Sequence, residues 1–570
     1  MFRTIAVLLL SSMLVFARHP KVAADLDGAD PSSTVDVIVQ FKTPPTKADL
    51  KQLGPYGQMK KIFDGINAVL LPLPVGTLDS IADNPNITFI SPDRPVQGLL
   101  DLTAAAVNAA AAWQSGYDGS GIGVAVIDSG IAPHSLFITA SGKLRVVYNQ
   151  DFTGDTQSLN LSDAYGHGTH VAGILGAKSS NTVFPAGGRN LQGIAPGVSL
   201  INLRALRSDG SGTDSSVIAA IQQAIALKSQ YNIRVINLSI GRAVFESYTK
   251  DPLCQAVEQA WKAGIVVVVA AGNQGRNNNS GIGGYGTITA PGNDPYVITV
   301  GAMKTEGTPT RTDDLIASYS SKGPTLYDHL VKPDLVAPGN LVVSVSPVST
   351  YNSGVNLWNN YAVTQIMDTY YCPSCWPGID TWYYRLNGTS MATPVVSGAA
   401  ALLLQKNPAL TPDQVKARLM KTAYKSFPAS SSATDTSTGT VYTSWYDIFT
   451  VGAGYLDIQA ALANTDVASQ PALSPAAVYN SSTNKVSLVA GANGVWGTNG
   501  VWGTNVVWGT NVLLANNVVW GTNIVWGSNT MQGFNVVWGT GTNGTIDPAN
   551  VVWGTTTNLE GMAVLTQGEK

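Results

Sequence analysis

The sequence predicts an α/β fold with a mostly parallel central sheet that helices cover on both faces. Beyond about residue 99, apolar runs of strand length alternate with segments of helical periodicity. This alternation is typical of parallel sheets, whose buried strands are apolar throughout. We expect strands at 123–127, 198–203, 234–238 and 265–270, with helices between them at 168–177, 215–228 and 254–263.

Two segments precede this domain. Residues 1–24 have the pattern of a secretory signal peptide, with Arg3 before an apolar run at 5–16 and small residues before a cleavage point. The run is too short to span a bilayer, so we expect a secreted protein, with an uncleaved anchor as the alternative. Residues 35–97 predict a small α+β module, with strands at 35–41, 62–73 and 87–90 and helices at 47–53 and 77–82.

The composition and length limit the partners and the number of domains that we expect. The 570 residues carry a net charge of −3, only 12% of them are charged, and no basic cluster occurs. Nucleic acid is therefore excluded as a partner. The length implies several domains.

Polar residues follow three of the predicted strands. They are Asp128, the segment Ser239-Ile240-Gly241, and Asn273. Ligands of open α/β sheets bind beyond the carboxyl ends of the strands. Asp128 also needs a hydrogen-bond partner, because a buried carboxylate is costly without one.

The histidines His167 and His170 lie on one predicted helix, His167 at its start. A metal pair on one helix face is an alternative to a catalytic role, but no carboxylate accompanies them as in zinc sites.

The stretch 388–394, Gly-Thr-Ser-Met-Ala-Thr-Pro, precedes an apolar run that predicts a buried helix. Pro394 is expected in the first helical turn, which places Ser390 at or before the helix start. Free backbone N–H groups there favour an anion. A simple capping turn is the alternative.

Together these residues resemble the subtilisin family of serine peptidases, over about 106–463. The resemblance rests on five blocks in the order Asp, His, Ser: 126–130 (Val-Ile-Asp-Ser-Gly), 167–173 (His-Gly-Thr-His-Val-Ala-Gly), 237–241 (Asn-Leu-Ser-Ile-Gly), 270–273 (Ala-Ala-Gly-Asn) and 388–394. It implies that Ser390 is the nucleophile, His167 the general base, Asp128 the orienting carboxylate and Asn273 the oxyanion donor.

The resemblance also implies where a substrate binds. An extended peptide would lie between two segments as an added strand, and a side-chain pocket would be lined by 270–272 and 287–291. The segments and pocket residues are Gly210, Ser211, Gly212, Ser239, Ile240, Gly241, Ala270, Ala271, Gly272 and Thr289. Thr289, where many relatives have Gly, would make the pocket shallow and favour medium apolar side chains.

The sequence departs from the family in two places. The loop at 174–194 lacks the calcium-binding pattern that is usual in the family, so a structural calcium ion is neither predicted nor excluded and the metal stays unknown. We expect the chemistry to require no cofactor. An insertion at 346–384 reads as a lid, an exosite or a packed surface elaboration. It holds Cys372 and Cys375, for which a short disulfide is favoured over a metal or redox site.

The domain boundaries follow from these assignments. The module at 35–97 resembles an inhibitory propeptide, cut off between about 97 and 106, and the catalytic domain spans 104–464. A linker (465–477) leads to a region (478–570) in which Val-Trp-Gly recurs seven times, mostly at multiples of six. An even spacing puts each Trp on the same face of a strand, so this region is predicted to be a β-rich repeat. Its stripe of Trp side chains would form a core, or a surface that binds polysaccharide or the cell surface. Alternatively, the region is a segment that is removed after secretion.

We therefore expect a secreted, monomeric serine endopeptidase that acts on protein and peptide substrates and is matured by removal of its own propeptide. The alternative is a surface-associated repeat protein whose protease domain serves mainly self-processing.

Overall fold

The computed structural model describes most of the chain from residue 30 to residue 489. The described residues are 19–23, 26, 30–92, 99–139, 141–155, 163–178, 191–277, 282–347, 383–435, 438–480, 485–489, 518–520, 536–538 and 569. They belong to two units, Met1–Val96 and Gln97–Lys570. Most of the predicted signal peptide and repeat region lies outside the described residues, as do Cys372, Cys375 and most of the insertion.

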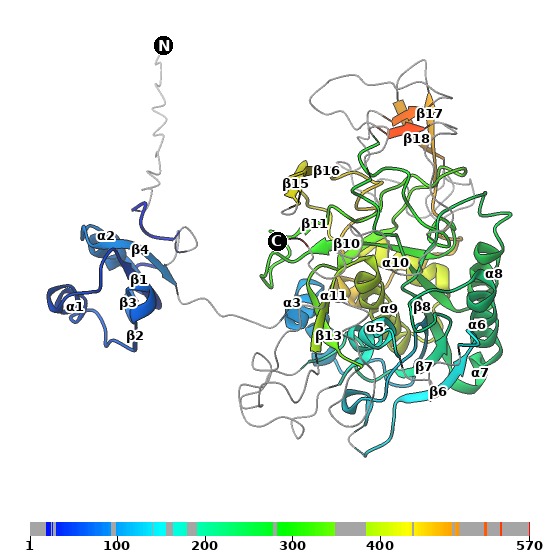
Figure 1. Ribbon diagram of the computed structural model, residues 1–570, viewed down its shortest axis with the longest axis horizontal. Coiled ribbons are helices and arrows are strands. Elements are labelled where there is room, and N and C mark those ends of the chain that lie inside the picture. The colour runs from blue at the N-terminus through cyan, green and yellow to red at the C-terminus, as the bar shows by residue number, and fades with distance from the viewer. Residues whose placement is uncertain are drawn as a thin grey trace, which may run out of the picture. The chain divides into compact units, whose positions relative to one another are not determined.

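The N-terminal unit is a four-stranded antiparallel sheet with two short helices (Figure 1). Its strands β1 (Thr34–Phe41), β2 (Lys61–Phe63), β3 (Ala68–Pro74) and β4 (Ile87–Pro92) pair in the order β2-β3-β1-β4, and its helices are α1 (Lys47–Leu53) and α2 (Leu78–Ala82). The segment with strand signals at 62–73 forms two strands, β2 and β3. Asn67, in the left-handed conformation (φ 49°), ends the 3₁₀ turn η2 (Asp64–Ile66) between them. A second 3₁₀ turn, η3 (Val75–Thr77), leads into α2.

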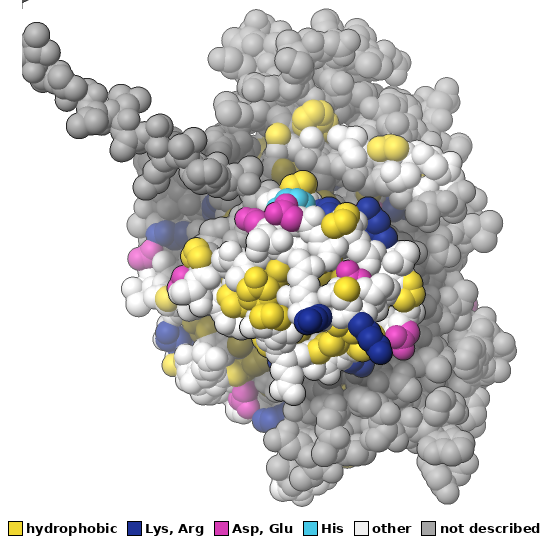
Figure 2. Space-filling model, turned by 90° about the vertical axis from the view of Figure 1, so that its left-hand side faces the viewer, with side chains coloured by type: hydrophobic (Ala, Val, Ile, Leu, Met, Phe, Trp, Pro, Cys, Tyr) yellow, Lys and Arg dark blue, Asp and Glu magenta, His cyan; other side chains and the backbone are white. Residues whose placement is uncertain are grey.

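One face of this small sheet forms a core and the other is open. Val37, Val39 and Phe41 are buried at alternate positions of β1. On the opposite face, Ile38 lies across from Leu70, and both are half-buried. In Figure 2, apolar side chains lie at several places on the face of this unit, together with Lys, Arg, Asp and Glu side chains.

The main unit contains an eight-stranded sheet that is parallel except for β11. Its order is β11-β10-β9-β8-β5-β7-β6, and β12 also pairs with β10. Four strands were predicted: β5 (Gly123–Asp128), β7 (Ser199–Arg204), β8 (Ile233–Leu238) and β9 (Val266–Ala270). Four were not: β6 (Val146–Asp151), β10 (Ile298–Lys304), β11 (Leu315–Ile316) and β12 (Leu335–Pro338).

Helices pack on this sheet in two groups (Figure 1). In one group, α6 (Asp214–Ala226) and α8 (Pro252–Lys262) pack against each other, with α7 (Lys228–Tyr231) after α6. In the other, α9 (Thr389–Lys406) packs on β8, β9, β10 and β12 and against α5 (His167–Gly176). The helices α3 (Leu99–Ala106), α4 (Ala109–Gln114), α10 (Pro412–Thr422) and α11 (Ile458–Ala463) and the turn η4 (Ser135–Phe137) complete the unit. The predicted three-layer α/β fold is confirmed.

Among the described residues, four small strand pairs lie outside the main sheet. Three are antiparallel: β13 (Val342–Val345) with β14 (Tyr383–Leu386), β15 (Ser430–Thr434) with β16 (Val441–Trp445), and β17 (Ala476–Asn480) with β18 (Lys485–Val489). In the repeat region, β19 (Val518–Trp520) and β20 (Val536–Trp538) run parallel, with Trp520 opposite Trp538. A search of the described residues finds no helix with the length and apolar character of a membrane span.

Candidate active site

The predicted site residues follow strands that end at one edge of the sheet. Asp128 is the last residue of β5, and Ser239 follows the end of the neighbouring strand β8. Asn273 lies three residues beyond the end of β9, the next strand. Because these strands are parallel, their carboxyl ends share the edge where ligands of such sheets bind.

Asp128 and His167 form a buried pair. The distance from His167 Nδ1 to Asp128 Oδ1 is 2.8 Å, and both side chains are fully buried. The glycine that follows His167 makes this approach possible, because a Cβ on Gly168 would lie 2.2 Å from the carbonyl oxygen of Gly130, just beyond β5. Among the described residues, His167 Nε2 has no hydrogen-bond partner. When the ring is neutral and carries its proton on Nδ1, facing Asp128, Nε2 is the unprotonated nitrogen.

The negative charge of Asp128 affects the pKa of His167. Burial by itself disfavours the imidazolium, but the charge and hydrogen bond of Asp128, with the charge of Asp163, outweigh it and raise the pKa above 6.5.

Asp163 holds the start of α5 and was not predicted from the sequence. Its carboxylate accepts hydrogen bonds from the N–H groups of Gly166 and Thr169, each at 2.7 Å, and from Ser129 Oγ at 2.8 Å. Ser129 Oγ in turn accepts from the N–H of Gly168 at 2.9 Å. Asp163 therefore satisfies orphan donors at the helix start that carries His167. The feature of the sequence that could have identified Asp163 is an acidic residue four positions before the start of the helix.

Ser390 lies in the first turn of α9 and contacts Ser239 twice. Ser390 Oγ donates to the carbonyl of Ser239 at 3.0 Å, and Ser239 Oγ donates to the carbonyl of Ser390 at 2.8 Å. The expectation that Pro394 stands in the first turn is wrong, since α9 begins at Thr389 and Pro394 lies inside it. A proline there leaves the carbonyl four residues earlier without its helical donor. That carbonyl belongs to Ser390, and Ser239 supplies the missing bond.

Asn273 is oriented by Thr389. The N–H of Thr389 donates to Asn273 Oδ1 at 2.9 Å, and the Thr389 hydroxyl does so at 3.1 Å. A backbone N–H can only donate, so the amide oxygen must face it and Nδ2 faces away. Gly388 (φ 145°) lies beside this amide, and a Cβ there would be 3.0 Å from Nδ2. The nitrogen is thus available to donate near the start of α9.

Sequence comparisons show which family this chain belongs to. The model of the subtilase family matches residues 119–442, more than half of the chain. The chain belongs to the subtilase family. It is 34% identical to serine protease AprX of Bacillus subtilis (63% of this chain, 74% of the relative), 36% identical to subtilisin DY of Bacillus licheniformis (54% and 85%) and 30% identical to subtilisin E of Bacillus subtilis (64% and 78%). This subtilase is accordingly a serine-type endopeptidase.

The predicted pocket segments of the subtilase meet at Thr289. This residue is buried, and its Oγ1 donates to the carbonyl of Ala271 at 3.3 Å. A Cβ on Gly241 would lie 2.3 Å from Thr289 Oγ1, and one on Gly272 would lie 2.8 Å from its Cγ2. The threonine side chain therefore occupies the space between the two glycine-bearing segments.

The other predicted substrate segment lies near His167. Gly210 adopts the left-handed conformation (φ 81°), and a Cβ there would lie 2.3 Å from the ring of Tyr165. The Tyr165 ring centroid is 6.5 Å from that of His167. Ser211 and Gly212 follow in the same loop, with the Ser211 carbonyl accepting from Arg207 N at 2.7 Å and Gly212 bridged to Leu206.

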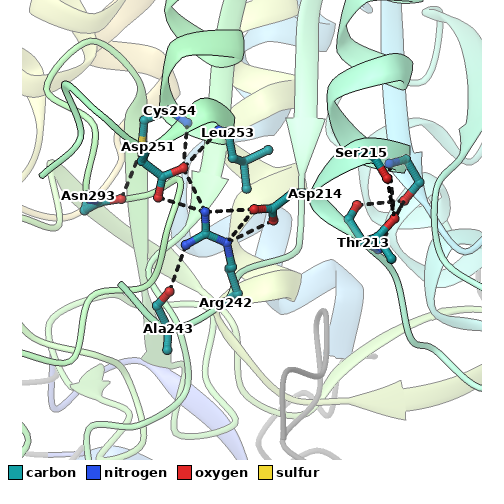
Figure 3. Close-up of polar contacts among 10 residues, drawn as sticks. Thr213, Asp214, Ser215, Arg242, Ala243, Asp251, Leu253, Cys254 and Asn293 are labelled. Carbon is teal, nitrogen blue, oxygen red and sulfur yellow. Dashed lines mark hydrogen bonds and ion pairs between the residues drawn. The ribbon is translucent and has the colours of Figure 1, made fainter. Parts of the chain in front are cut away.

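Arg242 fixes the segment that follows β8 and was not singled out in the sequence (Figure 3). Its guanidinium lies 2.9 Å from Asp214, the first residue of α6, and 2.8 Å from Asp251, the residue before α8. Its backbone exchanges two hydrogen bonds with Ala290, beside Thr289. Cys254, in the same cluster, is buried and reduced.

His170 has a structural role in this subtilase. Its Nε2 lies 3.1 Å from the carbonyl of Val342 and 3.2 Å from that of Tyr384, and burial followed by repulsion from His167 lowers its pKa to about 3. The Tyr384 hydroxyl donates to the carbonyl of Gly166, so the end of the insertion packs on α5. Within the described ranges, no group of three or more His, Cys, Asp or Glu could hold a metal ion.

Proposed function

We propose that this subtilase is a secreted endopeptidase in which Ser390, His167 and Asp128 act as nucleophile, base and orienting carboxylate. The observation that carries the proposal is the buried pair in which Asp128 binds His167 Nδ1 and Nε2 has no partner in the described part of the chain. A serine hydroxyl is a weak nucleophile until a base removes its proton. Nε2 is the base within this pair.

In the proposed reaction, Ser390 Oγ turns from the Ser239 carbonyl to His167 Nε2 and attacks the scissile carbonyl carbon. Its proton passes to Nε2, and Asp128 stabilises the imidazolium. His167 then gives that proton to the leaving amine as the peptide bond breaks. A water molecule, deprotonated by His167, attacks the acyl ester. The ester bond to Ser390 Oγ breaks, His167 returns the proton to that oxygen, and the second product is released. These steps use only side chains and water, and no calcium ion takes part in them.

The oxyanion of each tetrahedral intermediate would be held by two donors. One is Asn273 Nδ2, which the Thr389 contacts turn away from Oδ1. The other is the N–H of Ser390, which has no intrahelical acceptor because Ser390 is the second residue of α9. The helix dipole adds to the stabilisation.

We further propose that residues 35–97 are a propeptide removed during maturation. The open face of its sheet, with Ile38, Leu70 and the exposed Phe89, has the apolar character of an interface. Such a module suits a protease with a large parallel sheet, since non-local topology folds slowly. The proposed cut, between about 97 and 106, would fall at the start of the main unit.

The test compares secreted wild type with Ser390→Ala by intact mass and casein hydrolysis. We expect wild type to lose the signal and the propeptide and to cut casein, while the variant retains residues 35–97 and is inactive. Equal maturation of both proteins without casein cleavage would refute the assigned nucleophile. Maturation of wild type alone without casein cleavage would favour a self-processing surface protein.

A further inference from the structure

Glu569 lies in the main unit, buried among residues more than 200 positions earlier in the chain. Its carboxylate accepts from Arg276 at 2.8 Å, from the N–H of Ser318 at 2.9 Å and from the Ser318 hydroxyl. Its second oxygen lies 3.7 Å from Lys304 Nζ. Only 5% of the residue is exposed. A carboxylate is buried at this depth when cations and donors surround it.

The same site also binds the backbone of residue 569. Asn340 Nδ2 donates to the Glu569 carbonyl at 2.9 Å, and the Glu569 N–H donates to Asn340 Oδ1 at 2.9 Å. One amide thus pairs with both main-chain groups of a single residue, as a neighbouring strand would. We call Arg276, Lys304, Ser318 and Asn340 the Glu569 receptor. It recognises a glutamate by side chain and main chain together.

The cations of the receptor are shared with two other carboxylates. Arg276 lies 3.4 Å from Asp435, and Lys304 lies 3.1 Å from Glu306. Arg276 Nε also donates to Ser318 Oγ at 2.8 Å, which aims the guanidinium at the bound carboxylate. The receptor is therefore an organised site, in which hydrogen bonds as well as positive charge hold residue 569.

We propose that the tail segment carrying Glu569 is an internal ligand of the catalytic domain, docked in the Glu569 receptor of its own chain. The last linker residue before the repeat region is also bound, since Ala477 N donates to the carbonyl of His329 at 2.8 Å. Docking of Glu569 opposes the conformational entropy of the tail, so it needs a specific anchor.

The receptor also borders both walls of the proposed oxyanion hole, so a second part of the inference rests on the proposed function. Arg276 lies three residues after Asn273, and Asn340 follows Gly339, whose carbonyl accepts from the N–H of Gly388 at 2.9 Å. Loss of Glu569 would loosen both walls. Glu569 is thus a positioning residue for Asn273 and the start of α9.

Docking is tested in Ser390→Ala protein, so that its outcome does not depend on catalysis. A cleavage site for an external protease is inserted after Gly494, and the fragment carrying residue 569 is assayed for co-elution with the catalytic domain. We expect retention with the native tail and with Glu560→Gln, a control carboxylate in the same tail. Glu569→Gln and Arg276→Met should each release the fragment at least about tenfold faster, because charge-assisted hydrogen bonds are lost.

Equal retention in Glu569→Gln and the parent would overturn the docking. Retention that depends on Glu569 but vanishes when dimers are separated by dilution would place the ligand on a second copy and overturn docking within one chain.

Coupling to catalysis is tested in active, uncleaved enzyme with a small peptide. Glu569→Gln should lower kcat several-fold with little change in KM, and Glu560→Gln should change neither. An unchanged kcat in a variant that releases its tail would refute the coupling and leave the docking standing.

Discussion

His167 Nδ1 lies 2.8 Å from Asp128 Oδ1, and the same carboxylate oxygen accepts from the N–H of Ser129 at 2.7 Å. The backbone bond fixes the carboxylate, and the carboxylate fixes the ring. A ring held in this way can act through Nε2 alone. Its protonation state then controls the proposed reaction, since a protonated Nε2 cannot accept the proton of Ser390.

The first prediction concerns pH. Asp128 and Asp163 raise the pKa of His167, so kcat/KM should rise with pH through an inflection above 6.5, the ordinary value. The stability effect has the opposite sign: the stabilisation from this pair is complete below 6.5 and is lost as pH rises through the folded-state pKa. A profile of kcat/KM from about pH 5 to 9 measures the inflection.

Asp163→Asn provides the control for this profile. It removes one charge that raises the pKa of His167 without touching the ring, so the inflection should move to lower pH. An inflection at or below 6.5 in wild type would contradict the assignment of His167 as the titrating base.

The second prediction concerns Asn273→Ala. The change removes Nδ2 and should lower kcat by about 10²–10³ with KM little altered, a magnitude carried over from the corresponding asparagine of subtilisin, a member of this family. Steady-state kinetics on a small peptide measure it. Gln274→Ala, at the adjacent position, should leave kcat unchanged, and normal turnover of folded Asn273→Ala would remove the oxyanion role.

The strands that the sequence predicted share one property. β5, β8 and β9 consist mostly of apolar residues because both of their faces are covered, and that pattern is visible in one dimension, although β5 ends at Asp128 and β8 includes Arg234 and Asn237. β6 lies at the edge of the sheet with mixed exposure, so its residues show no such run. β10 is fully buried but includes Thr299 and Gly301, which break the apolar pattern.

The site residues likewise divide into those that the sequence pattern predicts and those that only the folded structure shows. The residues at strand ends could be found because topology alone brings them to one edge. The role of Asp163 and the contact of Ser239 with Ser390 could not be found, because both depend on residues far away in the chain. Ser239 replaces a helical bond that Pro394 removes 155 positions later, a relationship that exists only after packing.

The third prediction concerns the pocket. Thr289→Gly removes the side chain that lies between Gly241 and Gly272, so the pocket should deepen. We expect the ratio of kcat/KM for Phe over a medium apolar side chain at the cleavage position to rise about tenfold or more. Thr289→Ser, which keeps the hydroxyl and loses only the methyl group, should give an intermediate ratio. Wild type that already cuts mainly after Phe or Tyr would contradict a shallow pocket.

The fourth prediction compares a buried with an exposed ion pair. Arg242→Met leaves Asp251 buried without its cation and frees Asp214, which is one-third exposed. Breaking a buried pair costs about 3–5 kcal/mol of unfolding free energy. The lower end is expected, because Asp251 still accepts from Leu253 N at 2.9 Å and Asp214 can be hydrated.

Urea unfolding of Ser390→Ala protein, which cannot digest itself, measures this cost. Lys262→Met is the matched control, since Lys262 is 57% exposed and its pair with Glu258 lies on the surface of α8. It should shift the midpoint little, while Arg242→Met lowers it clearly. Equal midpoints for the two variants would mean that the Arg242 cluster does not stabilise the segment between β8 and α8, and Thr289 would then be held by other contacts.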